Sequence, residues 1–237
     1  MKDFFGKIAA LGIYAIIFAA CTKLDVVGQK SIDSFEQIVR LVTVEEGDTG
    51  FDLDAPDNTA RLFLSKNYIE GAYDILIDFD AKPFIDAGLD TGKMQTVIED
   101  AAGEVVSAFF SESSMFLSGD KIIANTILTH KKENTSAAST PQDAYKQIVE
   151  LNRESIGYHT ALDHYGINLG NGNLFEWAKD VNTNDKDIVF VLNPQPFIDA
   201  GVDPNKIDGW VFAKVSVDDE NGKPITLDKL LKPFNLK

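Results

Sequence analysis

One octapeptide occurs twice in this chain, and its repetition limits the possible folds more than any other feature. The sequence PFIDAGLD fills positions 83–90, and PFIDAGVD fills positions 196–203. Without any gap, the longer segments 74–93 and 187–206 agree at ten of their twenty positions. A similarity of this length at a fixed separation is typical of one structural unit that is used twice.

A second pair of segments predicts a helix at the start of each unit. SFEQIVRL at 34–41 resembles AYKQIVEL at 144–151, and in both segments apolar residues recur at helical spacing. Asp33 and Glu36 are spaced as a capping box that starts the first helix. Thr140 directly before a proline is a preferred start for the second helix.

Alternating apolar residues predict strands after each helix. The segments 51–64 and 165–177 alternate around turn sequences, so each is expected to form a β-hairpin. A third strand follows at 73–80 with one face toward water, and at 187–193 with both faces buried. Two further hairpins are expected at 115–130 and 209–227.

These elements predict an α+β protein of two tandem repeats, each with an N-terminal helix packed on a mainly antiparallel sheet. The small polar residues of 131–140 predict a linker between the first repeat, 31–130, and the second repeat, 141–237. The copies differ at 94–110, where apolar residues recur four apart. We expect an extra amphipathic helix there in the first repeat.

Every identity in the repeated octapeptide has a structural explanation. Proline suits the first turn of a short helix, glycine suits the left-handed residue that ends it, and phenylalanine supplies the hydrophobic contact of the cap. The aspartate is explained by the dipole of a first helical turn. The residues are Pro83, Phe84, Asp86 and Gly88 in the first copy and Pro196, Phe197, Asp199 and Gly201 in the second. We interpret the motif as structural rather than catalytic.

A search for catalytic and metal-binding patterns gives little. His159 and His164 lie on either side of Asp163, but their spacing is not that of a helical zinc pair. Ser118 begins an S-x-x-K pattern without the companion motifs of acyl-serine enzymes. The segment 180–185 resembles a calcium loop that lacks the required glycine and glutamate. We predict no catalytic residue, no cofactor and no metal; a hydrolase would need His159, Asp163 or Ser118 to meet in one cleft.

The N-terminus has the composition of a bacterial secretion signal. Two lysines precede an apolar run at 8–20, which is shorter than the roughly 20 residues needed to span a bilayer. The sequence Phe-Ala-Ala-Cys, which ends at Cys21, then resembles the lipobox of bacterial lipoproteins in its permissive, spirochaete-like form. This resemblance implies that 1–20 is a removable signal peptide and that 21–30 is a tether lipidated on Cys21.

The same resemblance implies a place in the bacterial cell envelope. Thr22 follows the cysteine where an aspartate would favour inner-membrane retention, so we expect an outer-membrane anchor that faces the periplasm or the cell surface. The net charge of −15 argues against nucleic acid as a partner. Because Cys21 is the single cysteine, the fold cannot depend on an intramolecular disulfide.

These features predict a noncatalytic cell-envelope lipoprotein that acts as a binding or scaffold module. Its partner is expected to be another envelope protein or an apolar ligand. The alternative is a carrier of lipid or another apolar ligand that uses the helix at 94–110 as a lid or membrane contact. The contact residues of that carrier would be Val97, Val105, Phe109 and Phe110.

Replacement of Cys21 by alanine should release the chain from the membrane, because acyl chains contribute about 0.8 kcal/mol per buried methylene to anchoring. Cell fractionation and metabolic labelling with a fatty acid test this prediction. A Thr22→Ala variant is the matched control and should stay labelled and membrane-bound. A Cys21→Ala protein that still sediments with membranes would contradict the lipoprotein interpretation.

Overall fold

A computed structural model describes most of the chain and shows an α+β protein, as predicted. The residues that it describes are 21–44, 49–53, 59–68, 73–96, 98–99, 101–102, 105–107, 114–126, 136–160, 162–183, 186–218 and 221–237. Residues 1–20, which were predicted to be a signal peptide that ends in a lipobox, lie outside this set.

Two antiparallel sheets contain most of the strands. The first sheet has the spatial order β1 (Phe51–Leu53), β2 (Ala60–Leu64), β3 (Ile75–Asp80), β7 (Lys121–Thr126) and β6 (Ser114–Ser118). The second has the order β12 (Val211–Asp218), β13 (Pro224–Phe234), β11 (Ile188–Leu192), β10 (Asn173–Ala178), β9 (His164–Gly170) and β8 (Ile156–His159). All four predicted hairpins are confirmed by the strand pairing.

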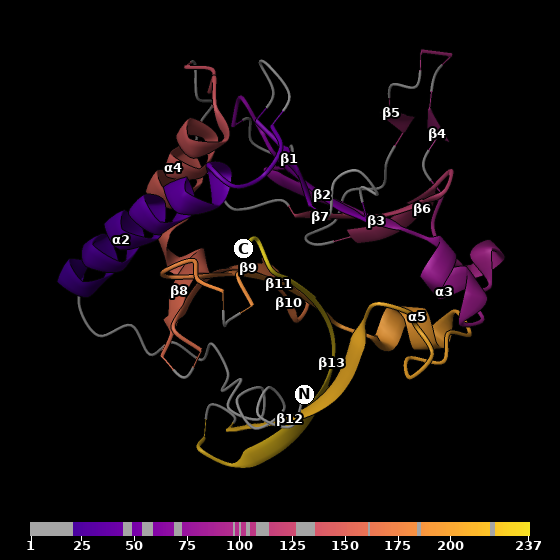
Figure 1. Ribbon diagram of the computed structural model, residues 1–237. Helices are drawn as coiled ribbons and strands as arrows, with labels where there is room; N and C mark the ends of the chain where they lie inside the picture. The colour runs from indigo at the N-terminus through magenta and orange to yellow at the C-terminus, as the bar shows by residue number, and fades with distance from the viewer. Residues whose placement is uncertain are drawn as a thin grey trace.

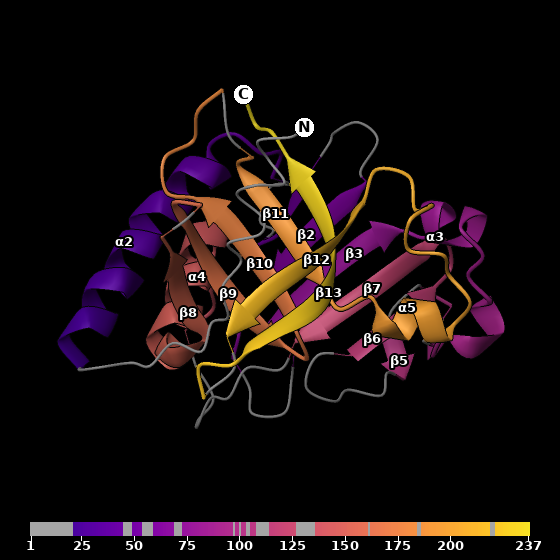
Figure 2. The same cartoon turned by 90° about the horizontal axis from the view of Figure 1, so that it is seen from below.

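In the described part of the chain, four α-helices accompany the sheets: α2 (Cys21–Val39), α3 (Lys82–Asp86), α4 (Pro141–Leu151) and α5 (Gln195–Asp199). The two sheets lie face to face, with α2 and α4 together at one end and α3 and α5 together at the other (Figures 1 and 2). Between the sheets, the rings of Phe79 and Phe190 meet edge to face at 5.3 Å. The main hydrophobic core therefore takes side chains from both sheets.

The two sheets have the same connectivity. In each, three consecutive strands, β1–β3 or β9–β11, are followed by a short helix and later by a hairpin, β6–β7 or β12–β13, whose second strand pairs with the third of the three. The third strands have the predicted burial, since β3 alternates between buried and half-buried residues and β11 is buried throughout. The second sheet adds β8, whereas the first has only an isolated bridge between Thr43 and Asp52 at that edge.

Each long helix contacts the sheet of the other half of the chain. Helix α2 contacts β8 and β10, and α4 contacts β2. The Ser34 hydroxyl in α2 donates to the carbonyl of Ala178 at 2.9 Å, and the Tyr68 hydroxyl donates to the carbonyl of Ala144 in α4 at 2.7 Å. The Phe35 ring stacks on Tyr145 at 4.3 Å. The halves thus share one core, and the domain boundaries proposed from the sequence stay a prediction.

The repeated octapeptides form the helix ends that were predicted. The Leu89 N–H donates to the Phe84 carbonyl at 2.9 Å and the Gly88 N–H donates to the Ile85 carbonyl at 3.0 Å, which is the Schellman pattern. The second copy repeats both hydrogen bonds at 2.9 Å. Gly88 and Gly201 have φ angles of 106° and 98°, which only glycine adopts without strain.

These two helix ends also pack on each other reciprocally. The Asp90 N–H donates to the Ala200 carbonyl at 2.8 Å, and the Asp203 N–H donates to the Ala87 carbonyl at 2.9 Å. The rings of the two buried phenylalanines that follow each proline lie 4.7 Å apart. Equivalent residues of the two halves therefore make the same contacts with each other.

The octapeptide aspartates do not lie where the sequence suggested. Asp86 and Asp199 are the last residues of α3 and α5, so neither meets the positive end of a helix dipole. Because each helix has only five residues, the aspartate falls at its end. There Asp86 pairs with Lys82, and Asp199 accepts a hydrogen bond from Gln195 at 2.7 Å.

The start of the first helix was also predicted wrongly. Helix α2 begins at Cys21, and Asp33 lies inside it, where its carboxylate accepts a hydrogen bond from the Gln29 side chain at 2.9 Å. The residues before Asp33 contain no proline, and Gly28 lies where an added Cβ would meet the Val149 side chain of α4 at 3.0 Å. Packing against α4 therefore extends the helix on the N-terminal side of the predicted capping box.

The predicted amphipathic helix at 94–110 is not formed in its described residues. A 3₁₀ turn (Thr91–Lys93) leads to a short hairpin of β4 (Ile98–Glu99) and β5 (Val105–Ser107), which stands apart from the two sheets in Figure 1. Before this hairpin, the Gln95 carbonyl accepts a hydrogen bond from the Leu117 N–H at 2.7 Å. The segment is rich in β-branched residues, which favour strands and lower helix propensity. Val97, Phe109 and Phe110 lie outside the described residues, and Val105 is in β5.

Alanine at Gly88 should destabilise the protein, because an added Cβ would lie 2.9 Å from the carbonyl oxygen of Gly201. Gly119 is the matched control, since its φ is 57° but an added Cβ would meet nothing within 4 Å. Urea unfolding should show that Gly88→Ala costs about 1–3 kcal/mol more than Gly119→Ala. Equal costs for the two variants would mean that the caps do not pack on each other.

Candidate functional site

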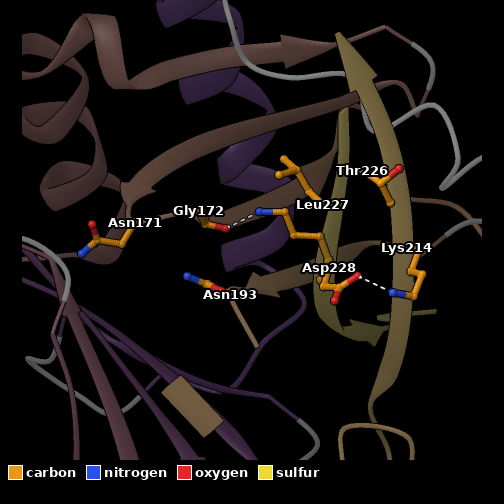
Figure 3. Close-up of a pocket in the computed structure, with 8 residues that line it drawn as sticks. Asn171, Gly172, Asn193, Lys214, Thr226, Leu227 and Asp228 are labelled. Atoms are coloured by element: carbon orange, nitrogen blue, oxygen red, sulfur yellow. Dashed lines mark hydrogen bonds and ion pairs between the residues drawn. The ribbon is translucent and has the colours of Figure 1, made fainter. Parts of the chain in front are cut away.

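The second sheet has an open pocket at the ends of its hairpins. Its volume is about 480 Å³, and its lining residues are Asn171, Gly172, Asn193, Lys214, Thr226, Leu227, Asp228 and Lys229 (Figure 3). This volume is within the usual range for small-molecule sites. The described lining contains two ammonium groups, one carboxylate, two side-chain amides and one hydroxyl, and the pocket surface is about equally polar and apolar.

The turn between β9 and β10 forms one side of the pocket. Asn171 and Gly172 have φ angles of 50° and 82°, as in the type I′ turn that their sequence predicts. On the neighbouring chain segment, the Asn193 N–H donates to the Asn173 side-chain oxygen at 2.8 Å. The Asn193 side-chain oxygen accepts a hydrogen bond from the Gln195 N–H at 3.0 Å, which fixes the orientation of this amide.

Lys229 connects the β12–β13 hairpin to that turn. Its ammonium group donates to the Gly172 carbonyl at 2.7 Å (Figure 3). A Cβ at Gly172 would lie 3.1 Å from the Lys229 nitrogen, so glycine leaves the space that the ammonium occupies. Burial lowers the pKa of Lys229, and the nearby Glu176 carboxylate acts in the opposite direction. On the pocket rim, Lys214 pairs with Asp228 at 3.2 Å.

A cluster of buried polar side chains lies on the outer face of the same sheet. Glu176 is fully buried, and its neighbours Phe175 and Trp177 point into the main core, so its own side chain lies on the opposite face. The two carboxylate oxygens lie 3.9 Å from Nδ1 of His159 and 4.0 Å from Nδ1 of His164. The two histidines pair across β8 and β9 and are 8% and 4% exposed.

Next to this polar cluster, the outer face of the second sheet carries a second hydrophobic cluster. Its buried members are Val189, Val191, Ala213, Val215 and Leu231. Figure 1 shows β13 curving away from β11, so that the β12–β13 hairpin bends out of the plane of the central strands. The outer face of this sheet is therefore built from buried side chains rather than from a solvated surface.

The outer face of the first sheet is different. Arg61 pairs there with Asp52 across β1 and β2, and Asp78 occupies the next strand. Burial raises the pKa of Asp78, while Lys121 and Arg61 lower it. These side chains are half-buried, as expected for a strand with one face toward water. The two sheets thus share a connectivity but not an outer surface.

The residues predicted as candidates lie away from the pocket. Cys21 is the first residue of α2, and the octapeptide residues form the paired helix ends. Of the residues named for a hydrolase, Ser118 lies in the first sheet and His159 in the second, and neither lines the pocket. Within the described ranges, no three His, Cys, Asp or Glu side chains are placed to hold a metal ion. None of the described helices is long and apolar enough to cross a membrane.

Sequence reasoning missed the pocket residues. The sequence predicted the Asn-Gly pair at 171–172 only as a hairpin turn and 209–227 only as a hairpin, and it gave no role to Lys214 or Lys229. One signal was present for the buried cluster: Glu176 stands between two aromatic residues in the otherwise apolar run 174–178. A carboxylate at such a position lies on the face of the sheet opposite the two aromatic side chains, and when buried there it needs hydrogen-bonding or charged partners.

The chain was compared with models of protein families, with curated proteins and with solved structures, and none matches it. The function therefore has to be argued from the site itself.

Removal of the Lys229 ammonium should change how stability depends on pH. Because the folded-state pKa of Lys229 lies below its unfolded value, the unfolded chain binds more protons, and the free energy of unfolding rises with pH up to about 10.4. Lys229→Met lacks this contribution. The free energy of unfolding of the wild type minus that of Lys229→Met, measured by urea titration, should therefore increase through the alkaline range. A difference that falls with pH would contradict the burial of this lysine.

Proposed function

We propose that this chain is a noncatalytic lipoprotein of the bacterial cell envelope that binds a partner through the pocket of its second sheet. Cys21 would anchor it, by preference to the outer membrane, and the rigid body would hold the pocket in the periplasm or at the surface. The pocket is the single observation that carries the proposal, because it gathers charged and hydrogen-bonding groups from three separate chain segments.

We infer that the body arose as two tandem α+β repeats. Strands β2 and β10 begin at Ala60 and Asn173, and β3 and β11 begin at Ile75 and Ile188, so equivalent strands keep the 113-residue offset of the octapeptides. The shared strand connectivity and the reciprocal helix ends support the same interpretation.

The lining favours binding over catalysis. Covalent catalysis needs a free nucleophile next to a general base, and the described lining residues that could take these roles are Thr226, Asp228 and the two lysines. Lys229 and Lys214 are instead engaged by the Gly172 carbonyl and by Asp228. These contacts hold the two ammonium groups at fixed places, which suits recognition of a ligand.

The carrier alternative has lost its main support. It depended on a helix at 94–110, and the described part of this segment is a 3₁₀ turn and a short hairpin. Leu227 is the one apolar side chain among the described lining residues, and charged and amide groups surround it, which favours a polar ligand over an acyl chain. The second hydrophobic cluster is itself packed and buried.

Photocrosslinking in living cells tests the proposed function. A photoreactive amino acid at Thr226, an exposed position on the pocket, should give a discrete crosslinked product in the envelope. The same amino acid at Lys206, an exposed position outside the pocket in the same half, is the control and should give none. Products at both positions, or at neither, would contradict a binding site in the pocket.

A further inference from the structure

We propose that the pocket binds a small, hydroxyl-rich molecule with a single carboxylate, which is the chemistry of an acidic amino sugar. The inference rests on the proposed function, because it names the ligand class of the same pocket. It follows from the size of the pocket, the balance of its charges and the kinds of hydrogen-bonding group that line it.

Size and polarity restrict the ligand first. A pocket of about 480 Å³ that is open to solvent admits a molecule of one or two sugar rings. Among the described lining residues, Leu227 is the single apolar side chain, and none has an aromatic ring. A ligand that depends on burial of a large apolar surface would therefore gain little, because that gain scales with the apolar area removed from water.

The charges of the lining favour one anionic group. Asp228 is paired with Lys214, so Lys229 is the one remaining ammonium among the described lining residues, and the nearby Glu176 carboxylate, which is not part of the lining, offsets its charge only from behind. An ammonium group has three donors, and the Gly172 carbonyl accepts from only one of them. A ligand carboxylate beside Lys229 would make a charge-assisted hydrogen bond and stabilise the charged form of this half-buried lysine.

The remaining groups favour neutral donors and acceptors on the rest of the ligand. The Asn171 and Asn193 side chains each offer an amide, and the Thr226 hydroxyl both donates and accepts. Hydroxyl and N-acetyl groups match such a lining. Polyanions do not, because the chain carries a net charge of −15 and repels a ligand with several negative charges.

Ligand-detected NMR and calorimetry with the purified full chain test the inference. The probe is N-acetylmuramic acid, and the comparison is N-acetylglucosamine, which lacks its carboxylate. The wild type should bind the acidic sugar at least about tenfold more tightly than the neutral one, the loss expected for one charge-assisted contact of about 1.4 kcal/mol. Lys229→Gln should remove this preference, while Lys206→Gln, which changes an exposed ion pair outside the pocket, should keep it.

Two outcomes would overturn the inference: equal affinity for the two sugars, or an unaltered preference in Lys229→Gln. If Lys229→Gln does not fold, the comparison of the two sugars with the wild type decides alone. If neither sugar binds while a protein is crosslinked at Thr226, this inference fails and the proposed function stands. If neither sugar binds and no crosslinked product forms, both fail.

Discussion

The close approach of Gly88 and Gly201 is the contact on which the rest of this structure depends. A side chain at either position would meet the backbone carbonyl of the other, at 2.9 Å and 3.1 Å. Both residues also need a left-handed backbone to end their helices. Glycine alone meets both requirements, and it lets Phe84 and Phe197 pack together in the core beneath.

This contact fixes one end of the molecule, and the exchange of helices fixes the other. Helices α2 and α4 lie side by side, and each contacts the sheet of the opposite half. A full separation of the halves would break the contacts of the paired helix ends and those of α2 and α4 with the opposite sheets. It would also expose the aromatic side chains between the sheets. The protein is therefore best understood as one cooperative unit, even though its sequence divides into two similar parts.

Local rules predicted much of the fold because they concern neighbouring residues. The Asn-Gly turn, the Thr140 cap of α4 and the alternation in β3 each depend on a few consecutive positions, and each formed as predicted. The prediction of a helix at 94–110 was wrong because apolar residues four apart also occur in strands when β-branched residues are common. The position of α2 depends on packing against α4, which no local pattern encodes.

The candidate site was harder to predict because its groups come from distant parts of the chain. Asn171, Asn193 and Lys229 meet only after β9–β11 and the last hairpin have formed one curved sheet. Glu176 and the two histidines likewise come together through strand pairing. In the sequence, each of these residues has the pattern of an ordinary turn or strand residue. The difference between the outer faces of the two sheets is found only by comparing the folded sheets.

Hydrogen–deuterium exchange of the full chain, with and without solubilised envelope glycan, tests the central claim most directly. The account predicts that added glycan slows exchange at the β9–β10 turn and along the β12–β13 hairpin, and leaves the five-stranded sheet unchanged. Slower exchange on the outer face of the five-stranded sheet, or no change anywhere, would contradict a binding pocket on the second sheet.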